Sequence, residues 1–213
     1  MTPRTLTLAS LVVLAAAAGT ASAVWWMGRG DDPFAPCREG AVAGAAAIGG
    51  PFDLVSETGE TVTAEAVLDE PSLVYFGYTY CPDVCPFDAS RNAEAVDLLA
   101  ERGYDVQPVF ISVDTERDTP EVMAEFTDYM HPDMLGLTGS PEQVKAAAQA
   151  YRVYYAKRGE DPATYLMDHT VFTYLMVPGH GFIDLFRGAP GASGEGVTAA
   201  EVADRTACYL SNT

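Results

Sequence analysis

Two cysteines separated by three residues are the part of the sequence best suited to chemistry. Cys81 and Cys85 lie in segment 80–86, directly after the apolar run 73–78. In a helix, residues four positions apart lie on one face, so the two sulfurs can converge on a single soft cation. The free N–H groups at a helix start also favour the thiolate form of cysteine. We therefore expect this pair to be a metal clamp or a redox switch.

The spacing of the cysteines favours metal binding over a stable disulfide. Thioredoxin-type redox sites have two residues between their cysteines, whereas Pro82, Asp83 and Val84 stand between this pair. Four helical positions separate Cα atoms by about 6 Å, so a bridge there is strained and easily reduced. A structural disulfide is the less favoured alternative, and Asp83 is expected to cap the helix or to face solvent.

A third metal ligand is expected from His169. Oxidoreductases with thioredoxin-like folds share a cis-proline before the strand that follows their long helical section, and here Asp168 and His169 occupy that place. Two thiolates and one imidazole suit trigonal Cu(I), whereas structural zinc needs a fourth protein ligand. His131 or His180 would have to supply that fourth ligand. Asp168 is expected to orient the His169 ring.

The segments around these residues predict an α/β fold. A β-hairpin is expected from 52–55 and 61–63, and the apolar run 72–78, helix 86–102 and strand 106–113 form a parallel β–α–β unit. The later elements are helices at 120–130 and 141–153, strands at 170–177 and 182–187, and a helix at 198–210. This order indicates a thioredoxin-like fold with an N-terminal hairpin and a central mixed sheet flanked by helices.

The N-terminal region predicts one transmembrane segment. Residues 5–27 carry no charge, and roughly 20 apolar residues span a hydrocarbon core of about 30 Å. We expect a membrane anchor or signal segment at 1–28, a tether at 29–50 and the thioredoxin-like domain at 51–213. The domain would then face the periplasm from the inner membrane. The alternative is secretion to the periplasm after cleavage near Ala23, where small residues form a cleavage pattern.

The charge of the chain argues against nucleic acid as a partner. The sequence contains 12 basic and 30 acidic residues, a net charge of −18. Such a surface repels phosphate backbones and is either a solvated surface or one that attracts cations and basic proteins.

The two remaining cysteines are candidates for a disulfide. Cys37 follows the predicted membrane segment, and Cys208 lies close to the C-terminus. Disulfides are common in exported proteins, and this one would tie both ends of the domain together. Two unpaired thiols are the alternative.

Three segments together closely resemble the Sco (SenC/PrrC) family of copper chaperones. They are YFGYTYCPDVCP at 75–86, FISVDTERDTPE at 110–121 and DHTVFTYLMVPGHG at 168–181. The resemblance extends over about 52–187. It implies copper ligands at Cys81, Cys85 and His169, and a structural or docking role for Asp114, Arg117 and Asp118.

The resemblance implies a membrane-tethered chaperone that helps to assemble the dinuclear copper site of cytochrome c oxidase. The partners implied are the copper-bearing oxidase subunit and another periplasmic copper carrier or a thiol reductase. The cargo would be Cu(I), Cu(II) or both, delivered by ligand exchange without enzymatic turnover. The main alternative is a thiol–disulfide oxidoreductase that uses Cys81 and Cys85 to reduce the cysteines of the oxidase copper site. A peroxiredoxin-like peroxidase is disfavoured because the pair Cys81 and Cys85 lacks the expected layout of a nucleophilic cysteine and a distant resolving cysteine.

Overall fold

The computed structural model describes residues 32–38, 40, 47–189 and 196–213. Contacts divide the chain into two units, Met1–Pro36 and Cys37–Thr213, and the predicted domain 51–213 lies within the second. The predicted membrane or signal segment 1–28, including the alternative cleavage site near Ala23, lies outside the described residues. Within the described ranges, no helix combines the length and the apolar character needed to cross a bilayer.

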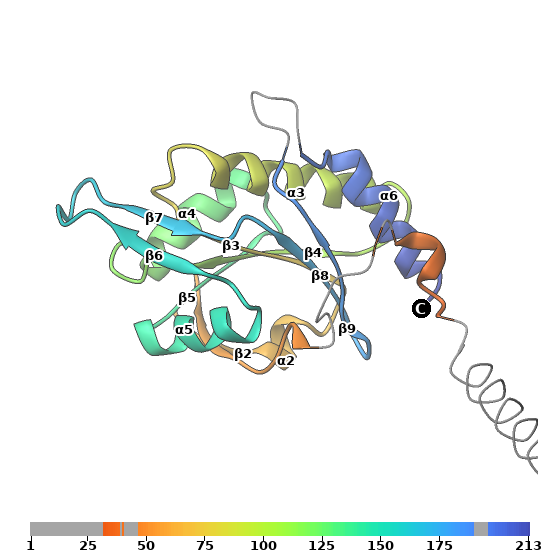
Figure 1. Ribbon diagram of the computed structural model, residues 1–213, viewed down its shortest axis with the longest axis horizontal. Coiled ribbons are helices and arrows are strands. Elements are labelled where there is room, and N and C mark those ends of the chain that lie inside the picture. The colour runs from red at the N-terminus through yellow and green to blue at the C-terminus, as the bar shows by residue number, and fades with distance from the viewer. Residues whose placement is uncertain (1–31, 39, 41–46, 190–195) are drawn as a thin grey trace, which may run out of the picture. The chain divides into compact units, whose positions relative to one another are not determined.

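A seven-stranded mixed sheet forms the centre of the second unit (Figure 1). Its strands are β1 (Asp53–Ser56), β2 (Thr61–Thr63), β3 (Ser72–Gly77), β4 (Gln107–Ser112), β5 (Leu135–Thr138), β8 (Thr173–Val177) and β9 (Gly181–Phe186). They are arranged in the order β2-β1-β5-β4-β3-β8-β9. Strands β3, β4 and β5 are parallel, and the other neighbours are antiparallel. The predicted N-terminal hairpin and mixed sheet are confirmed.

Helices cover both faces of this sheet (Figure 1). They are α2 (Ala64–Val67), α3 (Val84–Ala100), α4 (Pro120–Met130), α5 (Pro141–Ala150) and α6 (Ala199–Leu210), and a separate 3-10 helix, η1, spans Ala35–Cys37. Helices α3 and α4 connect successive parallel strands in the same direction across the sheet, and right-handed crossovers place both on one face. Helix α6 packs beside α3 on that face, while α5 and α2 lie on the other. This is the predicted thioredoxin-like arrangement.

The core of the sheet is strand β3. All six of its residues are buried, as expected for an apolar run covered on both faces. Val74 and Phe76 pack in one cluster with Phe110 of β4, Leu137 of β5 and Tyr174 of β8. Burying an apolar side chain of this size contributes about 1.5–3 kcal/mol. Strand β3 therefore gives the cysteines that follow it a rigid support.

Strand β5 is absent from the sequence-based prediction. It contains only four residues, including Gly136, and its intrinsic strand signal is weak. Long-range contacts define it instead. Strand β5 pairs with β4 and β1, and the backbone N–H of Gly136 donates to Glu57 at 2.7 Å.

The segment before β8 also differs from the prediction. The strand predicted at 170–177 begins only at Thr173. An unpredicted antiparallel pair, β6 (Tyr155–Arg158) and β7 (Leu166–His169), precedes it as a separate two-stranded sheet. None of the residues in these two strands is fully buried, and the strands lack the alternating apolar pattern of a half-buried strand. His169 is the last residue of β7.

A disulfide joins Cys37 to Cys208, with their Cα atoms 5.7 Å apart. This is the pairing considered from the positions of the two residues. The bond links the 3-10 helix η1 to helix α6, and the two cysteines are 171 residues apart in the sequence. It therefore closes a loop that contains the whole sheet.

Candidate metal centre

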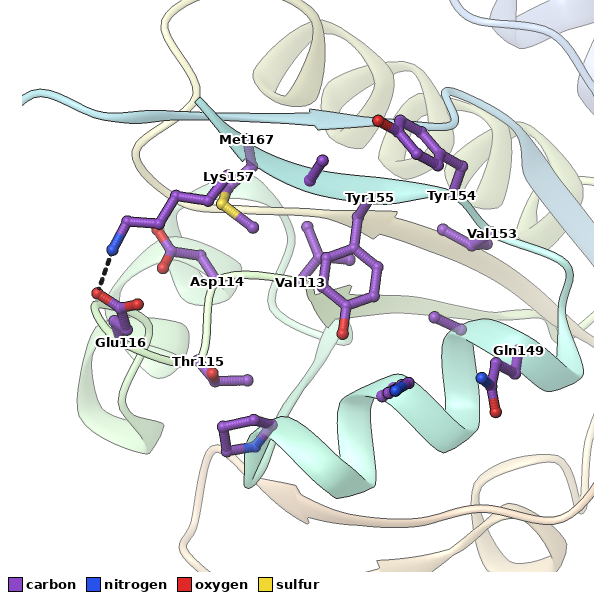
Figure 2. Close-up of a pocket in the computed structure, with 14 residues that line it drawn as sticks. Val113, Asp114, Thr115, Glu116, Gln149, Val153, Tyr154, Tyr155, Lys157 and Met167 are labelled. Atoms are coloured by element: carbon purple, nitrogen blue, oxygen red, sulfur yellow. Dashed lines mark hydrogen bonds and ion pairs between the residues drawn. The ribbon is translucent and has the colours of Figure 1, made fainter. Parts of the chain in front are cut away.

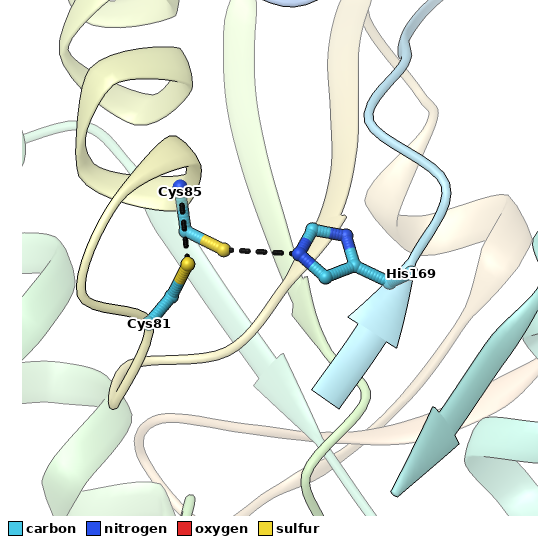
Figure 3. Close-up of side chains that lie close together, drawn as sticks. All are labelled: Cys81, Cys85 and His169. Atoms are coloured by element: carbon cyan, nitrogen blue, oxygen red, sulfur yellow. Dashed lines mark hydrogen bonds between the residues drawn. The ribbon is translucent and has the colours of Figure 1, made fainter. Parts of the chain in front are cut away.

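Cys85 lies in the first turn of α3, and Cys81 lies in the turn before it (Figure 3). The helix begins at Val84 rather than at the predicted residue 86, because proline is tolerated in a first turn, where its missing N–H has no helical acceptor. The cysteines therefore do not share a helical face as predicted. Instead, the backbone N–H of Cys85 donates to the Cys81 sulfur at 3.4 Å.

The Cys81 sulfur acts as a capping group for helix α3. Asp83 occupies the N-cap position, but its exposed side chain makes no capping hydrogen bond. Of the two roles expected for Asp83, the structure supports the one in solvent. Because the helix start is electropositive, a sulfur that accepts a hydrogen bond there is stabilised as thiolate.

His169 lies across from the two sulfurs, although 84 residues separate it from Cys85 (Figure 3). Its Nε2 is 3.2 Å from the Cys85 sulfur. The ligand atoms of Cys81, Cys85 and His169 all lie within 4.8 Å of one another. The structure thus brings together the three residues that the sequence singled out.

A backbone carbonyl fixes the tautomer of His169. Nδ1 lies 3.1 Å from the carbonyl oxygen of Thr170, which can only accept a hydrogen bond. Nδ1 therefore carries the hydrogen, and Nε2 presents its lone pair to the sulfurs. The rings of Tyr75 and Tyr78 meet the imidazole edge-on, with centroids 6.2 and 5.8 Å away. These contacts orient the imidazole for metal binding.

The expectation that Asp168 orients His169 is wrong. Consecutive residues of a strand point to opposite faces, so Asp168 faces away from the imidazole. Its carboxylate is 2.5 Å from Nε of Arg158 on the neighbouring strand β6. The two groups form an exposed ion pair.

The absence of a side chain at Gly77 makes room for Cys85. A Cβ atom at this position would lie 3.0 Å from the Cys85 sulfur and 2.8 Å from the Tyr75 ring. In the sequence, Gly77 stands inside the apolar run 73–78. A glycine inside a buried strand, directly before the cysteines, is nevertheless a recognisable signal for close packing.

The two thiols have opposite acidities. A hydrogen bond from the Cys85 side chain and further hydrogen bonds from the backbone N–H groups of Asp83 and Cys85 lower the pKa of Cys81 to about 4. Burial raises the pKa of Cys85, and the neighbouring Cys81 sulfur raises it further. Cys85 is completely buried, whereas Cys81 is partly exposed. Cys81 is therefore the reactive sulfur.

Alkylation should reveal this difference. Because Cys81 stays a thiolate down to about pH 4, its reaction with iodoacetamide in the folded protein should be nearly as fast at pH 6 as at pH 8. An ordinary thiol with a pKa near 8.5 slows roughly 75-fold over that interval. Peptide mapping by mass spectrometry measures each rate, and urea-unfolded protein is the control. If the alkylation of Cys81 slowed equally between pH 8 and pH 6 in the folded and the unfolded protein, its pKa would not be lowered by folding.

The structure brings neither His131 nor His180 to the cysteines. His131 accepts a hydrogen bond from the N–H of Asp133 and lies 3.3 Å from Asp97, while His180 lies in the turn between β8 and β9. Among the described residues, the cluster has no fourth histidine, cysteine or carboxylate ligand. Structural zinc, which needs four protein ligands, fits this site poorly. Two sulfurs and one nitrogen suit a soft, three-coordinate ion such as Cu(I).

This chain is similar in sequence and fold to proteins of the SCO1/SenC family. A sequence profile described as SCO1/SenC matches residues 40–204. Protein SenC of Rhodobacter capsulatus is 54% identical over 208 residues, which cover 97% of this chain and 90% of that protein. The crystal structure of Arabidopsis thaliana ScoI with copper bound has a TM-score of 0.72 at 40% identity, and covers 78% of this chain and 100% of that one.

A second solved structure gives the same result. Yeast Sco1 with copper bound has a TM-score of 0.69 at 34% identity, over 78% of this chain and 90% of that one. The profile match extends over most of the sheet and includes Cys81, Cys85 and His169. The chain belongs to the SCO1/SenC family.

Proposed function

We propose that this protein is a copper chaperone that binds copper through Cys81, Cys85 and His169 and delivers it to the dinuclear copper site of cytochrome c oxidase. The observation that carries the proposal is the convergence of two sulfurs and one imidazole nitrogen within 4.8 Å. Two solved relatives, from Arabidopsis thaliana and yeast, are described as having copper bound.

The asymmetry of the cysteines suits the release of copper. The buried Cys85 holds the ion from the protein side, while Cys81 and His169, both partly exposed, lie on the side open to a partner. A thiolate of the acceptor can approach from that side and displace the ligands one at a time. Transfer then needs only ligand exchange between sulfurs, without general acid–base chemistry.

The same proposal includes a location and partners. We place the domain in the periplasm, held by an N-terminal membrane anchor or released after cleavage near Ala23. The uncharged residues 5–27 support export, and so does the Cys37–Cys208 disulfide, since disulfides persist in oxidising compartments. The copper-bearing oxidase subunit would be the acceptor, and another periplasmic copper carrier or a thiol reductase would act before it.

Replacing His169 with alanine tests the ligand set. The variant should keep both sulfurs but lose the nitrogen donor, so it should bind Cu(I) more weakly than the unaltered protein. X-ray absorption at the copper edge should report two sulfur donors and one nitrogen donor in the unaltered protein and only sulfur in the variant. Replacing the exposed Arg158 with methionine provides a control on the same hairpin. An unchanged nitrogen signal in His169→Ala would overturn the assignment.

A second function, thiol–disulfide exchange, is favoured by one observation. An acidic, partly exposed Cys81 beside a buried Cys85 resembles the attacking and resolving thiols of a disulfide reductase. The His169→Ala variant separates the two functions. If it still reduces the oxidase copper-site disulfide but cannot deliver copper, the two roles are separate: delivery requires His169 and reduction does not. Loss of neither activity would leave His169 without the role proposed here.

A further inference from the structure

In the described part of the chain, no strand pairing connects the element that carries His169 to the one that carries the cysteines. The cysteines follow β3 of the main sheet, whereas His169 ends β7, whose pairing partner there is β6. A two-stranded ribbon is marginally stable by itself and needs other contacts to fix its position. The approach of His169 to the sulfurs therefore depends on side chains that join the hairpin β6–β7 to the body of the domain.

Segment 114–118, between β4 and α4, contacts both the turn that carries the cysteines and the hairpin β6–β7. Toward the cysteines, the Asp118 carboxylate accepts hydrogen bonds from the backbone N–H of Thr79 at 2.9 Å and from its hydroxyl at 2.6 Å. Thr79 lies two residues before Cys81. Toward the hairpin, the carboxylate of Asp114 accepts a hydrogen bond from the hydroxyl of Tyr165. Tyr165 is buried and directly precedes β7.

The guanidinium group of Arg117 contacts both the cysteine turn and the hairpin. Its guanidinium carbon lies 3.6 Å from the centre of the Tyr165 ring and 4.7 Å from that of Tyr80, the residue before Cys81. Its Nε donates to Asp114 at 2.6 Å. The two terminal nitrogens are buried and have no hydrogen-bond partner among the described residues. Cation–π contacts with the faces of the two rings replace hydrogen bonds, so the guanidinium is held by both Tyr80 and Tyr165.

The other contact between this segment and the hairpin is weaker. Glu116 and Lys157 form an ion pair at 2.6 Å beside a surface pocket (Figure 2). Both side chains are exposed, and ion pairs of this kind contribute little to stability. Lys157 also lies over the Tyr165 ring, 4.0 Å from its centre. Tyr165 thus attaches the hairpin to segment 114–118, and Arg117 links Tyr165 to the turn that carries the cysteines.

We propose that Arg117 is a positioning residue that holds His169 at the distance needed to bind copper together with Cys81 and Cys85. It does so by clamping Tyr165, next to β7, against Tyr80, next to Cys81. The inference rests on the copper-binding function proposed above. Without this contact, the hairpin moves away from the sulfurs. Copper would then be bound by the two thiolates, and His169 would coordinate it in only a fraction of the molecules.

A double-mutant cycle with Arg117→Met and His169→Ala tests this role. Cu(I) affinity is measured by competition with a chromophoric chelator, and copper-edge absorption gives the nitrogen donor count. Loss of a group that orients a metal ligand typically weakens binding 10- to 100-fold. We expect a loss of roughly 10-fold for Arg117→Met and a reduced nitrogen signal. In the His169→Ala background, the same substitution should change the affinity by less than about twofold, because a clamp on a missing ligand has no effect.

The outcomes distinguish this inference from the function on which it rests. Equal losses in both backgrounds, or no loss in either, would overturn the positioning role and leave the ligand set intact. No effect of His169→Ala alone would overturn the ligand set and the positioning role with it. The matched control is Arg158→Met, which removes an arginine from strand β6 of the hairpin but does not alter a contact with the cysteine turn. If Arg117→Met does not fold, Arg117→Lys replaces it in the cycle, because an ammonium cannot contact both rings and Asp114 at once.

Discussion

Replacing Cys85 with serine should abolish tight Cu(I) binding and leave the domain folded. Cu(I) prefers soft thiolate ligands, and a serine hydroxyl is a hard donor that stays protonated. The loss should exceed the roughly 10- to 100-fold typical of removing a group behind a metal ligand. The fold should persist because the serine hydroxyl can donate to the His169 nitrogen, which lies 3.2 Å from the present sulfur. Competition with a chromophoric chelator measures the affinity.

Cys81→Ser should lose Cu(I) in the same way, since both sulfurs belong to the cluster. The control is a variant with Cys37 and Cys208 both changed to serine, which removes two cysteines but leaves the cluster untouched. It should keep full copper affinity under conditions where it is folded. Tight binding by both Cys81→Ser and Cys85→Ser would refute the proposed site.

Removing the disulfide should produce the largest change in stability. The bond joins residues 171 positions apart, and loop-closure entropy for such a length corresponds to about 5 kcal/mol in the chain-entropy model. For a chain of this size, each kcal/mol shifts the melting temperature by roughly 2–4 °C. The variant with serine at positions 37 and 208 should therefore melt about 10–20 °C lower.

Chemical denaturation checks this prediction with the full chain. The midpoint should fall in the double-serine variant, and dithiothreitol should lower the midpoint of the unaltered protein by a similar amount. The Cys81→Ser/Cys85→Ser variant is the matched control, because it removes two free thiols and no covalent link. Identical midpoints with and without the disulfide would show that the bond does not stabilise the fold.

Local sequence patterns predicted most of the architecture. The apolar run of β3, the helix that follows the cysteines and the capped C-terminal helix are visible because each repeats its pattern over several residues. For α6, Thr198 and Glu201 form a capping box that marks the start of the helix. The sequence did not predict strands β5, β6 and β7, because these four-residue segments have a weak strand signal of their own. Their partners, rather than their own propensities, decide their conformation.

The candidate ligands were also visible in the sequence, through residue type and spacing. The pair Cys81 and Cys85 stands out near a helix start, and His169 occupies the place where related folds carry proline. How the fold orients Cys81 and His169 toward each other was not visible in the sequence. Helical spacing predicts both sulfurs on one helical face, and adjacency in the sequence predicts that Asp168 orients His169. In the structure, a turn presents Cys81, and the carbonyl of Thr170 orients the ring.

The sequence by itself determined the fold class, the family and the types of donor atoms, because these depend on composition, periodicity and short motifs. Only the tertiary structure decided which groups position the donors. The contacts of Arg117 with Tyr80 and Tyr165 join segments that are far apart in the chain. Such contacts follow from the packing of whole elements, since no local pattern specifies which distant side chain will lie opposite. The geometry of the metal site is therefore a property of the folded chain.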